Sequence, residues 1–250
     1  RLALFSVLSN TGLLMSKILA LDTSTQACSV ALWIDGEVRE DFRDIPRQHT
    51  QLLLPMVQQI LADAGLALSQ LDGIAFGRGP GSFTGLRICT GVTQGLALGA
   101  DLPVAPVSTL AALAQQAADE CQVDGVLAAL DARMDELYWG CYQLDPVSGV
   151  PILMGEERVC GPEWVTTPPL IQGKWIGYGT GWCYQDRLPA AVRDAVIQIE
   201  PRAEPRASAI AKLGAALIAA GQGVLPEQAL PVYLRDNVAL KKGEQRKGNR

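Results

Sequence analysis

Residues 17–34 read KILALDTSTQACSVALWI, and residues 125–143 read GVLAALDARMDELYWGCYQ. Each stretch holds a short apolar run that ends in an aspartate, Asp22 or Asp131, followed by a polar turn and a second run rich in β-forming residues. Strands often end in aspartate before a turn, so this match alone would be weak. The elements that follow also come in a matching order, which indicates two copies of one βββαβα unit.

Strands and helices alternate in the first copy, which is typical of an α/β protein with a mixed sheet. The second copy is poorer in helix, because proline-containing loops replace part of the pattern. The expected helices cover 49–64, 86–99, 108–118 and 207–220, and the expected later strands cover 73–76, 103–107, 125–131, 136–143 and 175–178.

The duplication predicts a first subdomain over 15–118 and a second over 119–235. Residues 1–14 are apolar and precede Met15, and no small-residue cleavage site follows them, so we expect an artefactual leader rather than a signal peptide. Residues 236–250 form a polar tail that is expected to be flexible. The last ten residues of this tail hold five Lys or Arg and one Glu.

The composition limits the possible functions of the 250-residue chain. Its 48% hydrophobic and 19% charged residues are typical of a globular protein, and no apolar run approaches a membrane span. A net charge of −5 disfavours tight nucleic-acid binding by the chain alone, although the basic tail could touch RNA. Six scattered cysteines and a single histidine, His49, predict a reduced, cytoplasmic protein without a metal site.

Strand-terminal aspartates in paired repeats suggest the actin, sugar-kinase and Hsp70 architecture, in which each repeat offers one turn to the phosphates of a nucleotide. The hydroxyls of Thr23 and Ser24, beside Asp22, suit this role. The turn after Asp131 does not, because Arg133 and Met134 are bulky where a phosphate needs room. We therefore interpret both turns as vestigial, with two plain hairpin turns as the alternative.

Residues 77–87, GRGPGSFTGLR, form the most specific motif of the chain. Gly79 and Gly81 permit a positive φ, and Ser82 and Thr84 could cap the helix that follows. The motif lacks the Gly-Lys-Ser/Thr of a P-loop and the glycine spacing of a dinucleotide fingerprint. It is either an anion-binding helix start, with Arg87 in its first turns, or a tight strand-to-helix turn.

The helix after this motif carries Gly91, Gly95 and Gly99 on one face. A glycine inside a helix costs roughly 1 kcal/mol relative to alanine, so three in register indicate the close approach of another helix. That second helix could belong to the same subdomain or to a partner.

The segments KILALDTSTQACSVALW, GRGPGSFTGLRI, ALDARMDELYW and PVYLRDN together resemble the TsaB (YeaZ) family, over about residues 15–239. The resemblance implies an actin-like (ASKHA, ribonuclease-H-like) fold whose second βββαβα subdomain is degenerate. It also implies a non-catalytic subunit that acts with TsaD, bound directly in a 1:1 ratio, and with the ATPase TsaE. The complex transfers threonylcarbamoyl from threonylcarbamoyl-AMP to N6 of adenosine 37 in tRNAs that read codons beginning with A.

The resemblance further implies that this chain binds no cofactor, meets tRNA only through the complex and forms a homodimer when alone. TsaD binds its metal through a His-x-x-x-His motif, and the matching positions here are Thr109 and Leu113. By the same resemblance, helices 49–64 and 86–99 dock TsaD or a second copy. The implied interface residues are Leu53, Met56, Val57, Ile60, Ile88, Gly91, Val92, Gly95 and Gly99.

Two other functions stay open on sequence alone. Asp22 and its hydroxyl-rich turn would suit an ATP-dependent small-molecule kinase of the same superfamily. A protease, or a chaperone-like regulator of TsaD, rests only on the naming of some relatives, and no protease motif such as Gly-x-Ser-x-Gly is present.

Overall fold

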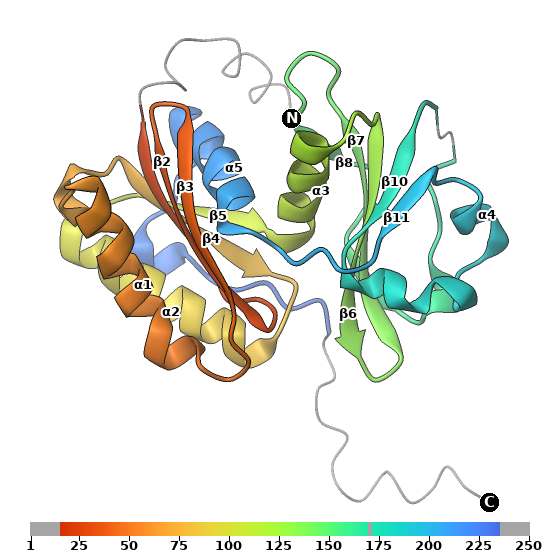
Figure 1. Cartoon of the computed structure of the whole chain (residues 1–250), viewed down its shortest axis with the longest axis horizontal. Helices are drawn as coiled ribbons and strands as arrows, with labels where there is room; N and C mark the ends of the chain where they lie inside the picture. The colour runs from red at the N-terminus through yellow and green to blue at the C-terminus, as the bar shows by residue number, and fades with distance from the viewer. Residues whose placement is uncertain (1–15, 170–171, 236–250) are drawn as a thin grey trace, which may run out of the picture.

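The computed structural model describes residues 16–169 and 172–235, which form two lobes side by side (Figure 1). The predictions for the leader and for the basic tail lie outside these residues. Each lobe is built around one mixed sheet, and among the described residues no helix is long and apolar enough to cross a bilayer.

The first sheet has the strand order β3-β2-β1-β4-β5. Neighbours among β1, β2 and β3 run antiparallel, whereas β4 and β5 are parallel to β1. Five of the six residues of the central strand β1 are buried, as expected for a strand covered on both faces. The strands are β1 (Lys17–Asp22), β2 (Ala27–Ile34), β3 (Glu37–Asp44), β4 (Gly73–Gly79) and β5 (Val104–Ser108).

The second sheet repeats this arrangement with the order β11-β10-β6-β7-β8, and β9 also pairs with β7. Here β7 is antiparallel to β6, while β10 and β11 are parallel to it, so β6, β7, β10 and β11 correspond to β1, β2, β4 and β5. The predicted duplication is therefore confirmed. The strands are β6 (Gly125–Arg133), β7 (Glu136–Leu144), β8 (Pro151–Leu153), β9 (Arg158–Cys160), β10 (Trp175–Tyr178) and β11 (Gln198–Glu200).

Most helices begin and end within about two residues of the predicted positions. Gly65 ends α1 with a φ of 65°, and the Ser108 hydroxyl accepts a hydrogen bond from the amide of Ala111 at the start of α3. The described helices are α1 (His49–Ala64), α2 (Phe83–Ala100), α3 (Thr109–Glu120), α4 (Ala190–Arg193) and α5 (Ala207–Ala219), with 3₁₀ turns η2 (Leu68–Gln70), η3 (Pro162–Trp164), η4 (Thr180–Arg187) and η5 (Pro226–Gln228).

The helix after the glycine motif begins at Phe83, three residues before the predicted start. Ser82 is its N-cap, and the hydroxyl oxygen of Ser82 accepts a hydrogen bond from the amide of Gly85 at 3.4 Å. Thr84 lies inside the first turn and does not cap it, because only the residue at the N-cap position places its side chain against the free amides.

Each lobe is completed by one helix from the other half of the sequence. α1 and α2 cover one face of the first sheet, and α5 covers the other face, although α5 comes from the end of the chain (Figure 1). α3, from the first half of the sequence, packs against β6 and β7 of the second sheet. The predicted division at 118/119 therefore does not separate the lobes, because α3 and α5 each complete the lobe of the other half.

Within residues 119–169 and 172–235, the second lobe has no long helices that correspond to α1 and α2. Between β9 and β10 the described residues form only the short η3, and η4 and α4 cover the outer face of the sheet. Three buried tryptophans, Trp139, Trp175 and Trp182, fill the space under these short elements. The second subdomain is thus degenerate, as predicted.

Candidate functional site

A cleft of about 1180 Å³ lies between the lobes. The turns that follow β1 and β6, which carry the paired sequence stretches, lie on opposite walls of this cleft. The start of α2 and the C-terminal residues 232–235 complete the lining. The duplicated stretches therefore meet at one place, as the repeat predicts.

Ser24, Thr25 and Gln26 of the first turn line the cleft, but the hydroxyls of Thr23 and Ser24 are bonded inside the first lobe. The Thr23 hydroxyl donates to the carbonyl of Gly85 at 2.7 Å, and the Ser24 hydroxyl donates to the Asp22 carboxylate at 2.8 Å. Asp22, at the end of β1, and Thr23 and Ser24 of the turn are each at most 1% exposed. Both hydroxyls therefore donate inside the first lobe rather than toward a ligand in the cleft.

The glycine motif is shaped by this buried turn. A Cβ atom on Gly81 would lie 2.5 Å from the Ser24 carbonyl oxygen, and one on Gly85 would lie 1.9 Å from that of Thr23. The Ser82 amide donates to the Ser24 carbonyl at 2.7 Å. The motif is therefore a tight strand-to-helix turn packed against the β1–β2 turn, which was one of its two interpretations.

Asp22 does not line the cleft. Its Oδ1 atom is buried without a hydrogen-bond partner and lies so close to Gly77 that a Cβ there would be 1.9 Å away. Burial raises the pKa of Asp22 from 3.8 to about 7, against the lowering effect of hydrogen bonds from Ser24. A carboxylate placed in this way cannot face a nucleotide-bound metal in the cleft, which weighs against the kinase alternative.

The second turn is exposed to the cleft and carries charge. Asp131 accepts hydrogen bonds from the Arg133 amide at 2.8 Å and from the Arg133 guanidinium at 2.9 Å. Arg133 has a φ of 63° and, like Asp131, lines the cleft. Met134 is 82% exposed and is absent from the lining, so the expectation that it fills the site is wrong.

The C-terminal segment 232–235 connects the two lobes across the cleft. The Val232 amide donates to the Arg78 carbonyl at 2.7 Å, and the Tyr233 ring lies 5.2 Å from that of Phe83. At the far end, the Arg235 guanidinium pairs with Glu136 and donates to the Arg133 carbonyl at 3.4 Å. This segment therefore restrains the distance between the start of α2 and the β6–β7 turn.

The described residues hold no group of three or more His, Cys, Asp or Glu side chains that could bind a metal ion. The Nε2 atom of His49 lies 3.1 Å from the carbonyl oxygen of Ala27, so His49 anchors the start of α1 to β2. Thr109 and Leu113 are fully buried in α3.

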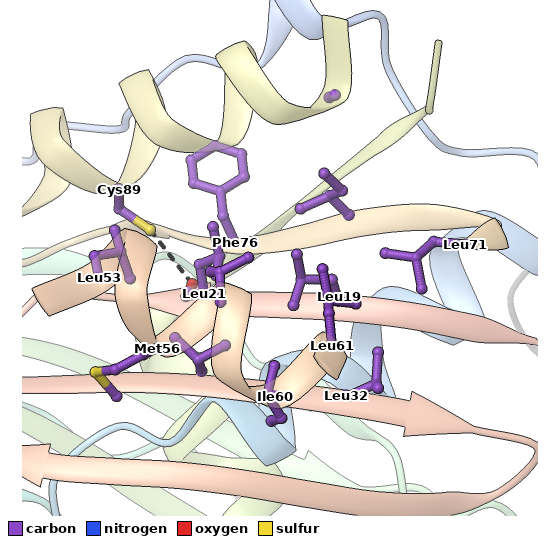
Figure 2. Close-up of a cluster of buried hydrophobic side chains, with 14 of the residues drawn as sticks. Leu19, Leu21, Leu32, Leu53, Met56, Ile60, Leu61, Leu71, Phe76 and Cys89 are labelled. Carbon is purple, nitrogen blue, oxygen red and sulfur yellow. Dashed lines mark hydrogen bonds between the residues drawn. The ribbon is translucent and has the colours of Figure 1, made fainter. Parts of the chain in front are cut away.

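The predicted interface residues separate into two groups. Leu53, Met56, Val57 and Ile60 point from α1 into the core of the first lobe and are at most 7% exposed (Figure 2, which labels all but Val57). The expectation that these four contact a partner is wrong, because the apolar stripe of α1 covers its own sheet. Ile88 and Val92 are half-buried beside the same core.

The three glycines of α2 face outward. Among the described residues, no other part of the chain comes within 4 Å of a Cβ built on Gly91, Gly95 or Gly99, so no described helix of the same lobe packs closely against them. Exposed residues of α1 and α2 together form what we call the outer helical face. They are Thr50, Gln51, Leu54, Pro55, Gln58, Gln59, Ala62 and Asp63 of α1, and Phe83, Thr84, Arg87, Gly91, Gly95, Leu98 and Gly99 of α2.

This face is short of charge. In the two helices only Asp63 and Arg87 are charged, and the Arg87 guanidinium lies 3.9 Å from the centre of the Phe83 ring. Leu54 is 44% exposed and Leu98 is 74% exposed. Two neighbouring helices with few charges and several small residues form a surface that another protein could approach closely.

Comparison with known proteins places the chain in a family. The model of the family described as TsaD, tRNA N6-adenosine threonylcarbamoyltransferase, matches residues 43–242. The chain is 46% identical over 231 residues to the tRNA threonylcarbamoyladenosine biosynthesis protein TsaB of Escherichia coli K12, covering 90% of this chain and 97% of that protein. This chain belongs to the TsaB family.

Other relatives agree with this assignment. The TsaB protein of Haemophilus influenzae is 40% identical over 235 residues, with 90% of this chain and 96% of that protein covered. The solved structure of YeaZ from Pseudomonas aeruginosa superposes with a TM-score of 0.82 at 51% identity, over 88% of this chain and 100% of that one. The predicted TsaB (YeaZ) membership, within the TsaD-related superfamily, and the predicted actin-like fold are therefore confirmed.

Several cleft residues of this TsaB-family chain escape prediction from sequence. Tyr138 donates to the Gly81 carbonyl at 3.5 Å, and Glu204 and Thr180 lie on the walls. Tyr233 and Arg235 belong to the PVYLRDN segment, which signals the family but gives no local sign of a position in the cleft. All five come from parts of the chain distant in sequence from the glycine motif.

Proposed function

We propose that this TsaB-family chain takes part in forming threonylcarbamoyladenosine in tRNA, as the names of its relatives indicate, and that it does so as a non-catalytic subunit. In this proposal it binds TsaD directly in a 1:1 ratio and works with TsaE in the cytoplasm. TsaD catalyses the transfer of threonylcarbamoyl from threonylcarbamoyl-AMP to adenosine 37, and TsaE hydrolyses ATP. The tRNA contacts this chain only through the complex. The chain itself holds no cofactor.

The outer helical face is the observation that carries this proposal. Three outward glycines destabilise α2 and serve no packing within the lobe, so a partner that needs close backbone approach gives them a purpose. The proposed partner surface consists of exposed residues such as Leu54, Gly91, Gly95 and Leu98. In the absence of TsaD, a second copy would cover the same face.

The cleft supports a non-catalytic role. Asp22 is enclosed and protonates near neutral pH, while Asp131 is paired with Arg133. The positions that match the TsaD histidines by family resemblance hold Thr109 and Leu113, neither of which suits a metal. The six cysteines all lie within the described residues and are free there.

A mixing experiment with purified TsaD tests the proposal. Size-exclusion chromatography with light scattering should show a homodimer of this chain converting into a 1:1 heterodimer when TsaD is added. In a separate assay, threonylcarbamoyladenosine (t6A) should form only when this chain is mixed with TsaD, TsaE, ATP, tRNA and the threonylcarbamoyl donor. Formation of t6A by this chain without TsaD would refute the non-catalytic role. Calorimetric binding of ATP to the chain alone, with transfer to a small molecule, would favour the kinase alternative.

Gly95→Leu should weaken TsaD binding while leaving the chain folded. A leucine has room in the isolated lobe but would hold a neighbouring helix away, and overpacking of this kind costs about 2 to 3 kcal/mol, a loss of roughly 30- to 150-fold in affinity. Calorimetric titration with TsaD measures the loss. Ala219→Leu, at an exposed position on α5, is the matched control and should bind normally. Equal affinity of Gly95→Leu and the control would show that the glycine stripe faces solvent in the complex.

A further inference from the structure

A second, smaller pocket of about 240 Å³ lies between the lobes and shares no lining residue with the cleft. Leu213 and Leu217 of α5 form one wall, and Pro151 and Leu153 of β8 also line it. Its volume is below the range of pockets for drug-sized ligands, so it suits a molecule of only several heavy atoms.

One carboxylate is fixed in this pocket by both lobes. The Glu157 Oε1 atom accepts hydrogen bonds from the Ser108 hydroxyl at the end of β5 and from the Tyr142 hydroxyl on β7. Tyr142 is 2% exposed, and burial together with the charge of Glu157 raises the pKa of Tyr142 well above its usual value, so the hydroxyl stays protonated and donates. A carboxylate offers about four acceptor positions, so Glu157 can accept further hydrogen bonds.

One cation lines the same pocket without a counter-ion. The Nε atom of Arg78 is buried and has no hydrogen-bond partner, and within the part of the chain that the structure describes Arg78 forms no ion pair. Arg78 is half-buried, and leaving its buried Nε–H without an acceptor is costly, because the desolvation of that group is not compensated. Arginine can form a bidentate pair with a carboxylate, and a carboxylate ligand would therefore remove this cost.

We propose that this pocket binds a small aliphatic α-amino acid as a zwitterion. The ligand carboxylate pairs with Arg78, its ammonium group pairs with Glu157, and its side chain lies against the leucines of α5. An inorganic anion would satisfy Arg78 but would be repelled by Glu157, and a simple amine would leave Arg78 unpaired. Only a molecule with both charges matches both groups.

Calorimetric titration of the full chain tests this with three probes of matched shape: L-valine, isovalerate, which lacks the ammonium group, and isobutylamine, which lacks the carboxylate. L-valine should bind with a dissociation constant of about 10 μM to 1 mM, a range that suits a ligand of this size. Each of the two half-ligands should bind at least about tenfold more weakly. Equal binding of isovalerate would make this an anion site, and no binding of L-valine at tens of millimolar would show that only water fills the pocket; either result overturns the proposal.

Variants locate the binding. Glu157→Gln keeps an acceptor for Ser108 and Tyr142 but loses the charge, and Arg78→Gln removes the cation, so each should weaken L-valine binding at least about tenfold. Glu156→Gln, next to Glu157 but absent from the lining, is the matched control and should bind normally. Ala111→Leu should block the pocket by volume without touching either charge, which keeps the test valid if Arg78→Gln does not fold. Normal L-valine binding by Ala111→Leu and Glu157→Gln would place the ligand elsewhere and refute this site.

Discussion

Gly85→Ala is expected to destabilise the chain by more than about 4 kcal/mol, whereas Gly91→Ala on the same helix should stabilise it by about 0.5 to 1 kcal/mol. A Cβ at position 85 would lie 1.9 Å from the carbonyl oxygen of Thr23. The Thr23 hydroxyl already binds the Gly85 carbonyl at 2.7 Å, so the two backbones are held together from both sides and cannot separate cheaply. At position 91 no atom from elsewhere in the described chain lies within 4 Å of the added Cβ, so alanine only improves helix propensity.

Urea unfolding followed by circular dichroism measures both changes. The pair is matched, because the two substitutions add the same methyl group to the same helix and differ only in what that group meets. A loss below about 1 kcal/mol for Gly85→Ala, the ordinary size of a point-mutation effect, would show that the β1–β2 turn moves aside easily. It would also remove the structural explanation of the glycine motif.

The stability of the chain should fall as pH rises, because of Asp22. The folded-state pKa of Asp22 is raised from 3.8 to about 7, so between these values the folded chain keeps a proton that the unfolded chain loses. Each pH unit in this window should therefore lower the free energy of unfolding by about 1.4 kcal/mol, up to about 4 kcal/mol in total. Above the folded-state pKa both states are ionised, and this dependence ends.

Asp22→Asn isolates this contribution. The variant keeps an acceptor for Ser24 and has no carboxyl to titrate, so its stability relative to the wild type should rise by several kcal/mol from pH 4 to pH 8. Asp63→Asn, at an exposed position of α1, is the control and should leave the wild-type profile unchanged. If the difference between Asp22→Asn and the wild type is the same at both ends of this range, Asp22 ionises in the folded chain as it does in the unfolded one.

The fold was largely predictable from sequence because its main signals are local. The buried runs before Asp22 and Asp131, the terminator Gly65 and the cap Ser108 each depend on a few neighbouring residues. The exchange of α3 and α5 between the lobes was missed, because a helix of small residues such as α5 gives no sign of which sheet it covers. Gly214 of α5 shows the reason only in three dimensions, where a Cβ would lie 2.3 Å from the Cβ of Ala75.

The candidate site was predictable in part. The glycines in and before α2 predicted that another part of the chain or a partner packs closely against this helix. They did not tell which glycines meet the chain's own backbone and which face outward. Gly81 and Gly85 accommodate the turn at Thr23 and Ser24, about sixty residues earlier, while Gly95 faces open space. Likewise Leu53 and Met56 have the spacing of any amphipathic helix, which cannot tell a core from a partner. The distinction depends on which face of α1 meets the sheet, and only the assembled lobe determines that.

The exchange of helices also sets the order in which this chain can fold during synthesis. Domains usually fold as units, the N-terminal one first, as they leave the ribosome. Here one face of the first sheet stays bare until α5, which ends at Ala219, has been made. The apolar side chains on that face, such as Ile18, Ala20, Ala75 and Ala105, therefore stay uncovered until the last quarter of the polypeptide has been synthesised. The nascent chain exposes this apolar surface through most of its translation.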